Sequence, residues 1–181
     1  MNTTVVAALC VFSFVSSITP GPNNVMLFAS GVNFGFRRTI PHMFGISIGF
    51  GVMLAAVGAG IGALVTQVPG VLLAIKIVGG LYMLWLAWKI ANSGPVAQAE
   101  GTASPMTFMQ AALFQWVNPK AWMMATFAMA TYTASGNYWV NVAIISSVFA
   151  AINLPAVGVW AGFGQALREV LKDPFWLRVF N

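Results

Sequence analysis

The sequence contains very few charged residues, and acidic residues are the scarcest of them. Only 6% of its 181 residues are charged, and three residues are acidic. A typical soluble domain has about 25% charged residues. The hydrophobic share of 59% and the mean hydropathy of +0.84 therefore predict an all-α integral membrane protein. The length suffices for five or six spans of about 20 residues each, and it leaves no room for a separate soluble domain.

Residues that would support catalysis or metal binding are also scarce. The single cysteine, Cys10, excludes an internal disulfide and an all-cysteine metal site, and its place in an apolar run favours a packing role. The apolar segments contain neither a Ser/His/Asp set nor a cluster of metal ligands. We therefore predict no enzyme and no cofactor. Because the basic residues are not clustered with aromatic residues, we expect the lipid bilayer as a partner and no nucleic acid.

Five apolar segments follow one another along the chain. They cover residues 5–30, 40–66, 71–91, 106–133 and 139–163. Residues 92–105 form the only long polar linker in the sequence. The tail, residues 165–181, reads either as a helix at the membrane interface or as the start of a sixth span. The sequence thus predicts one transmembrane domain over residues 1–181.

The basic residues are distributed unevenly between the two sides that these segments define. Six of them fall on one side, namely Arg37, Arg38, Lys89, Arg168, Lys172 and Arg178. The opposite side consists of the N-terminus and the turns "QVPG" and "ASGNY", and it has none. Because cytoplasmic loops carry an excess of Lys and Arg, this asymmetry predicts an external N-terminus and a cytoplasmic Arg37/Arg38 loop.

Two of the apolar segments are interrupted by proline with asparagine beside it. The first contains "TPGPNN" at residues 19–24, and the fourth contains "NPK" at residues 118–120. A proline removes one backbone donor and frees a carbonyl one turn earlier, and in hydrocarbon such a group needs an internal partner or a wet cavity. The two breaks are three spans apart, so their segments cross in opposite directions. Discontinuous helices at matching places in inverted halves indicate a transporter site, although a proline kink alone is common in membrane helices.

The predicted substrate-binding residues come from the two breaks and from two further polar positions. They are Thr19, Pro20, Gly21, Pro22, Asn23, Asn24, Lys76, Asn118, Pro119, Lys120 and Asn153. Charged residues within spans usually face the protein interior, which favours a functional role for Lys120. Lys76 is equally well explained as a side chain that reaches the interface. The asparagines either pair with carbonyls freed by the prolines or contact substrate, and these roles are compatible.

Two pairs of glycines have the spacing of close helix contacts. These pairs are Gly45/Gly49 and Gly158/Gly162, each with three residues between its members. Such GxxxG pairs allow the backbones of two membrane helices to approach closely. They predict tight packing and offer a face for a homo-oligomer.

The first break belongs to a longer pattern of residues. The stretch "TPGPNNVMLFASGVNFGFRRTIPHMFGISIGF" resembles the opening signature of the LysE/RhtB family of amino-acid exporters. The stretches "KIVGGLYMLWLAWKI" and "FQWVNPKAW" resemble motifs of the third and fourth segments of that family. The pattern is most similar to the cysteine and O-acetylserine exporter branch. The resemblance covers nearly the whole chain and implies inverted repeats and proton-driven export of small amino acids across the bacterial inner membrane.

The sequence departs from this family pattern in two ways. Members usually have six spans, whereas this sequence ends where the sixth is expected. Several branches have an aspartate near the position of Phe50, whereas no apolar segment here contains an acidic residue. Proton coupling would then depend on Lys76 or Lys120, and passive export is the alternative. A small non-transporting membrane subunit or channel is the other class left open.

The topology prediction is testable by cysteine labelling. In a variant that lacks Cys10, one cysteine placed within "FGFRRT" at residues 34–39 should not react with an impermeant thiol reagent added outside intact cells. It should react after permeabilisation, because the basic residues hold this loop in the cytoplasm. Labelling in intact cells would contradict the predicted orientation.

Overall fold

The computed structural model describes residues 1–62, 67–68, 70–91, 104–134 and 136–172, and its regular elements within these ranges are all helices. The elements in chain order are α1 (Thr3–Ile18), α2 (Pro22–Phe34), α3 (Phe36–Ala56), η1 (Val57–Ile61), α5 (Val71–Ala91), α6 (Phe108–Phe114), η3 (Gln115–Val117), α7 (Pro119–Tyr132) and α8 (Tyr138–Lys172). The predicted all-α class is confirmed.

The described helices include some that are long and apolar enough to cross a membrane. Phe36–Ile61 and Tyr138–Val170 meet this condition singly, and α1 and α2 meet it as a pair bent by 56°. A shorter apolar helix covers Leu73–Tyr82. These helices confirm a membrane protein. The expected count of five spans and the inverted repeat stay predictions, and residues 63–66 of the second predicted span lie outside the described residues.

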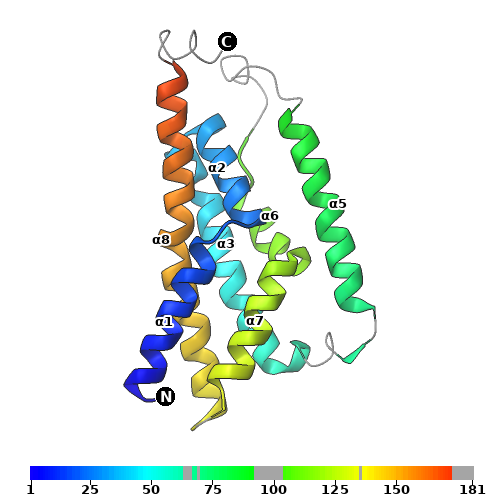
Figure 1. Cartoon of the computed structure of the whole chain (residues 1–181), viewed down its shortest axis with the longest axis vertical. Helices are drawn as coiled ribbons and strands as arrows, with labels where there is room; N and C mark the ends of the chain where they lie inside the picture. The colour runs from blue at the N-terminus through cyan, green and yellow to red at the C-terminus, as the bar shows by residue number, and fades with distance from the viewer. Residues whose placement is uncertain (63–66, 69, 92–103, 135, 173–181) are drawn as a thin grey trace.

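The helices run between two ends of the molecule, and α8 extends along most of its length (Figure 1). The turn between α2 and α3 lies at the same end as the last residues of α5 and α8. The N-terminus and the turn between α7 and α8 lie at the opposite end. The described basic residues other than Lys76 and Lys120 thus lie towards one end of the molecule. They are found at the start of α3 (Arg37 and Arg38), at the end of α5 (Lys89) and at the end of α8 (Arg168 and Lys172). Which end faces the cytoplasm stays a prediction.

The connection between α2 and α3 is much tighter than the sequence suggests. A polar loop was expected before residue 40, but α2 ends at Phe34 and α3 begins at Phe36. Gly35 alone joins them, with a φ of 80° that glycine adopts without steric cost. The Phe36 N–H, a donor that the first turn of α3 leaves without a helical partner, donates to Gln165 Oε1 at 2.9 Å.

The C-terminal part of the described chain also differs from expectation. Residues 165–172 continue α8 without a break, and the role of the tail at the membrane stays a prediction. The helix passes through Pro155. Residues 173–181, the rest of the predicted tail, lie outside the described residues.

The predicted glycine pairs have different surroundings. Gly45 and Gly49 lie against α6, where an added Cβ would meet Phe108 O at the first position and the Ala112 Cα at 2.5 Å at the second. Because α6 of the same chain occupies this face, it does not provide a contact with another copy. Gly162 has no heavy atom within 4 Å of an added Cβ. An oligomer through the other glycine pair therefore stays a prediction.

The buried apolar residues form two clusters on either side of the helix breaks. The first cluster includes Leu9, Met53 and Met129. The second cluster includes Leu27 and Val157. Helix α1 contributes to the first cluster and α2 to the second. The break between α1 and α2 therefore lies between the two clusters. Polar side chains at this level are held in place by apolar packing above and below.

The role of the close α3–α6 contact is testable with one methyl group. Gly49→Ala should lower the midpoint of thermal unfolding of the detergent-purified protein, because overpacking of this kind costs about 1–3 kcal/mol. Gly162→Ala is the matched control. It should leave the midpoint unchanged or raise it, since alanine favours a helix over glycine and this position has open space. Equal midpoints in the two variants would contradict the packing argument.

Candidate substrate-binding site

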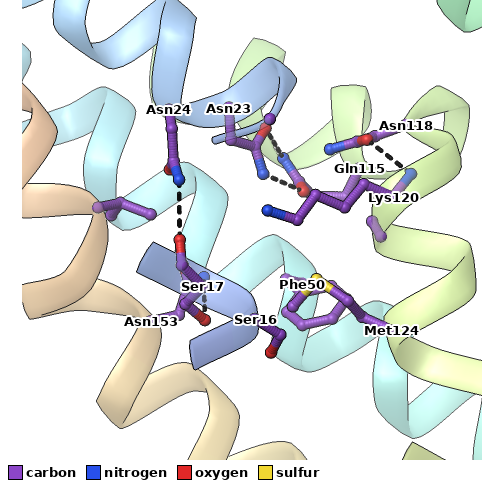
Figure 2. A pocket seen from close by; sticks show the side chains of 13 residues that line it. Ser16, Ser17, Asn23, Asn24, Phe50, Gln115, Asn118, Lys120, Met124 and Asn153 are labelled. Atoms are coloured by element: carbon purple, nitrogen blue, oxygen red, sulfur yellow. Dashed lines mark hydrogen bonds between the residues drawn. The ribbon is translucent and has the colours of Figure 1, made fainter. Parts of the chain in front are cut away.

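A polar pocket lies where the two helix breaks meet (Figure 2). It encloses about 320 Å³ of space between atoms, including the space at its open side. Its lining residues are Ser16, Ser17, Gly21, Asn23, Asn24, Phe50, Gln115, Asn118, Lys120, Ala121, Met124, Asn153 and Val157. Lys120 is the one charged residue in this described lining.

The first break leaves several backbone carbonyls at the end of α1 without their usual helical donors. A helical carbonyl accepts from the N–H four residues later, and prolines at 20 and 22 have none to offer Ser16 and Ile18. The Thr19 hydroxyl donates to Ser16 O at 3.0 Å. The indole of Trp160, on α8, donates to Ile18 O at 3.0 Å. Side chains thus replace the donors that the prolines remove.

Asn24 pairs with two further carbonyls of this break. Its buried side-chain amide donates to Ser17 O at 2.9 Å and to Thr19 O at 2.7 Å. Its Oδ1 is buried and has no hydrogen-bond partner. Because an unpaired buried acceptor is costly, this oxygen at the pocket wall is a place for a donor from a ligand or a water molecule.

The second break is built around the N-terminus of α7. Asn118 is the N-cap and its Oδ1 accepts from the Lys120 N–H at 3.1 Å, while Pro119 occupies the first helical position. The Trp122 indole donates to Trp116 O at 2.8 Å, in place of the helical donor that Asn118 has taken. An added Cβ at Gly79 of α5 would lie 2.5 Å from Val117 O, so α5 packs closely on this break.

Two amide side chains join the breaks directly. Asn23 donates to Gln115 Oε1 at 2.9 Å, and Gln115 donates to Asn23 Oδ1 at 3.1 Å. Gln115 also donates to Ala111 O at 2.9 Å, which fixes the orientation of its amide. Figure 2 shows the pair as two parallel hydrogen bonds at the pocket wall. The pair links the start of α2 to the end of the α6–η3 segment.

Lys120 makes the second link between the breaks. Its Nζ donates to Thr19 O at 2.7 Å and to Thr19 Oγ1 at 3.0 Å, with Pro20 O at 3.4 Å. Figure 2 shows the side chain extending from α7 towards Asn23. The carbon stem crosses Gly21, where an added Cβ would lie 2.7 Å from Lys120 Cδ. A larger residue at position 21 would displace the lysine.

A chain of buried polar side chains supports the pocket from below. Asn153 on α8 donates to Ser17 Oγ at 3.0 Å, and Ser47 on α3 donates to Asn153 Oδ1 at 3.0 Å. The three side chains are buried and connect α1, α3 and α8. These helices therefore hold one wall of the pocket as a unit.

The pocket contains groups that favour a negatively charged ligand group, and beside them hydrogen-bond acceptors that favour a positively charged one. The N-termini of α2 and α7 both lie at the pocket, with Gly21 and Asn118 as their N-caps. Helix N-termini and the Lys120 ammonium favour negative charge. The carbonyls of the first break and Asn24 Oδ1 are acceptors that favour a donor with positive charge.

The structure separates the predicted site residues into three groups. Gly21, Asn23, Asn24, Asn118, Lys120 and Asn153 line the pocket. Thr19 and Pro20 contact the lysine, while Pro22 and Pro119 begin α2 and α7. Lys76 lies apart, with an exposed side chain on α5. The binding roles of all these residues stay predictions.

Several residues that line the pocket were not predicted from the sequence. They are Ser16, Ser17, Phe50, Gln115, Ala121, Met124 and Val157. Gln115 carried a detectable signal, because a glutamine is rare in an apolar segment and lies directly before the second break. Phe50 was indicated only by the family resemblance, which has an aspartate near its position, and Val157 carried no signal, since an apolar residue in a span has no property that separates a pocket wall from packing.

Comparison with known proteins identifies the class of this protein. The family model described as LysE type translocator matches residues 3–172. The cysteine/O-acetylserine efflux protein of Salmonella typhimurium is 31% identical over 174 residues, which cover 95% of this chain and 88% of that protein. The protein of the same name in Escherichia coli strain K12 is 28% identical over 175 residues, covering 96% and 89%. No solved structure matches the chain.

The protein is therefore a membrane translocator. It belongs to the LysE type translocator family, which confirms the resemblance seen in its sequence motifs.

Proposed function

We propose that the protein exports small neutral amino acids, or derivatives similar to cysteine and O-acetylserine, across the bacterial cytoplasmic membrane. The observation that carries this proposal is the single pocket to which both helix breaks contribute. Family membership and the names of the two relatives support the same activity. The basic residues at one end support an external N-terminus and a cytoplasmic Arg37/Arg38 loop.

The chemistry of the pocket favours a zwitterion. A substrate carboxylate would be held by Lys120 and by the N-termini of α2 and α7. A substrate ammonium would donate to the carbonyls of the first break and to asparagine oxygens. Because the described lining has no acidic residue, it offers no negative charge to balance a cationic side chain in addition to the ammonium group. The small volume and the apolar walls at Phe50 and Met124 suit a short uncharged side chain.

Alternating access would follow from movement of one half of the protein against the other. Helices α1, α2 and α3 pack along α8, and α7 packs against α1, α3 and α8 as well as against α5 and η3 at the second break. The contacts that bridge the two breaks are hydrogen bonds of Lys120 and of the Asn23–Gln115 pair. We propose that these hydrogen bonds exchange during the transport cycle, since discontinuous helices at a central site move in this way in other transporters.

The proposed site is tested by export from cells at equal membrane abundance. Asn118→Ala and Lys120→Ala should each reduce efflux of O-acetylserine below a tenth of the parent rate, because each removes a polar group of the pocket. Asn33→Ala is the matched control and should retain efflux, since this asparagine donates to Ala29 O within α2 and does not line the pocket.

Two further variants separate related explanations. Asn118→Ser keeps an N-cap acceptor, so loss of efflux in this variant points to the pocket and not to helix capping. Lys76→Ala should retain efflux, because its side chain does not line the pocket. Near-parental efflux from both Asn118→Ala and Lys120→Ala would contradict the proposed site and would reduce these two residues to packing roles.

We also propose that export is coupled to protons. No acidic residue lies in a predicted span, and Lys120 is the amine in the pocket, so we assign the proton exchange to this lysine. In proteoliposomes loaded with O-acetylserine, an imposed pH gradient should accelerate efflux several-fold. Lys120→Met should remove this acceleration. Efflux that is insensitive to the gradient in both proteins would establish passive export instead.

A further inference from the structure

We propose that the oxygens around Lys120 Nζ form the binding subsite for the ammonium group of the substrate. The lysine occupies this subsite in the structure, and substrate enters by displacing it. This proposal rests on the proposed function. It adds the location of the subsite for the ammonium group and a physical reason why zwitterions are preferred. It is carried by the geometry of the first break and by one unpaired buried oxygen.

The surroundings of Lys120 Nζ match the donor geometry of an ammonium group. A primary ammonium has three N–H donors and no acceptor. Three oxygens accept from Nζ here, the carbonyls of Thr19 and Pro20 and the hydroxyl of Thr19. The substrate ammonium has the same three donors, so the oxygens that bind one group also suit the other.

The break creates these acceptors and also makes them accessible. Thr19 is the C-cap of α1 with extended backbone, and the chain stays extended at Gly21. The side chain of Thr19 is exposed, and the pocket reaches the adjacent Gly21. The donors given to the carbonyls at positions 19 and 20 are therefore side chains, those of Asn24 and Lys120.

Asn24 Oδ1 provides the independent observation. This oxygen belongs to a residue that lines the pocket, is itself buried and has no partner, although the amide nitrogen of the same side chain already donates to Thr19 O. Lys120 supplies donors to Thr19 and Pro20 but not to this oxygen. A substrate ammonium placed at the subsite would have an additional buried acceptor beside it, which favours exchange.

The exchange requires both charged groups of the substrate. When substrate ammonium takes the three oxygens, the lysine ammonium loses its partners, and an unpaired charge away from water is costly. The carboxylate of the same substrate supplies the lysine with a new partner. An amine without a carboxylate cannot do so, and a carboxylic acid without an amine leaves the oxygens unpaired. The subsite thus selects zwitterions over both partial analogues.

The test removes the lysine and supplies a free ammonium ion in its place. Ethylammonium is added to the purified full chain in detergent, and the midpoint of thermal unfolding is measured. The Lys120→Ala protein should show a saturable rise in this midpoint, because its subsite is vacant. The parent protein should show none at the same concentrations. Lys120→Met is the matched control, since its apolar stem still covers Gly21 and it should show no rise.

Two controls establish that the ion occupies the proposed oxygens. Tetramethylammonium has no N–H donor and should not shift the midpoint of Lys120→Ala. Adding Thr19→Val to Lys120→Ala should abolish the ethylammonium shift, while Thr19→Ser should retain it, because serine keeps the hydroxyl. A shift that persists with Thr19→Val, or is equal for both ions, would overturn the subsite. So would the absence of any shift in folded Lys120→Ala protein.

A second measurement applies if Lys120→Ala does not fold. With O-acetylserine as the probe, Thr19→Val in the parent chain should raise the half-saturating concentration about tenfold, as expected for loss of a hydrogen bond to a charged group. Thr19→Ser should change it less than twofold, and equal values for all three proteins would overturn the subsite. An ethylammonium shift without any O-acetylserine binding or export would instead contradict the proposed function and leave the subsite standing.

Discussion

A backbone carbonyl that loses its helical donor inside a membrane must find another donor, and much of this structure follows from that requirement. The prolines of the first break remove donors from Ser16 and Ile18, and the extended chain beyond frees the carbonyl of Thr19. The replacements come from the hydroxyl of Thr19, from Asn24, from Trp160 on α8 and from Lys120 on α7. Pairing these carbonyls brings three distant parts of the chain to one point.

The polar groups around this point form a layer between two apolar clusters. Glycines without side chains allow α3 to lie against α6, and α2 to lie against α8 through Gly31 and Gly164. Such contacts in lipid depend on close packing, because lipid tails are as apolar as the side chains. The clusters therefore fix the helix positions, while the polar layer provides groups that can exchange partners.

The charge distribution in the pocket distinguishes this chain from the family pattern that its motifs resemble. Phe50, near the position where several branches have an aspartate, lines the pocket as an aromatic wall. The charge in the described lining comes instead from Lys120, at the other break. The field that a ligand meets in the described lining therefore has the sign of the Lys120 ammonium and of the two helix N-termini.

The sequence by itself determined the helical membrane character, the positions of both breaks and most of the polar residues that line the pocket, because composition, proline and asparagine act locally. It also indicated the family through motifs around those breaks. The tertiary structure alone decided that Gln115 pairs with Asn23 and that Lys76 lies apart from Lys120. It also decided that α6 covers the Gly45/Gly49 face and that one glycine joins α2 to α3. Each of these depends on which helix faces which, and residue spacing along one segment does not specify its neighbour in space.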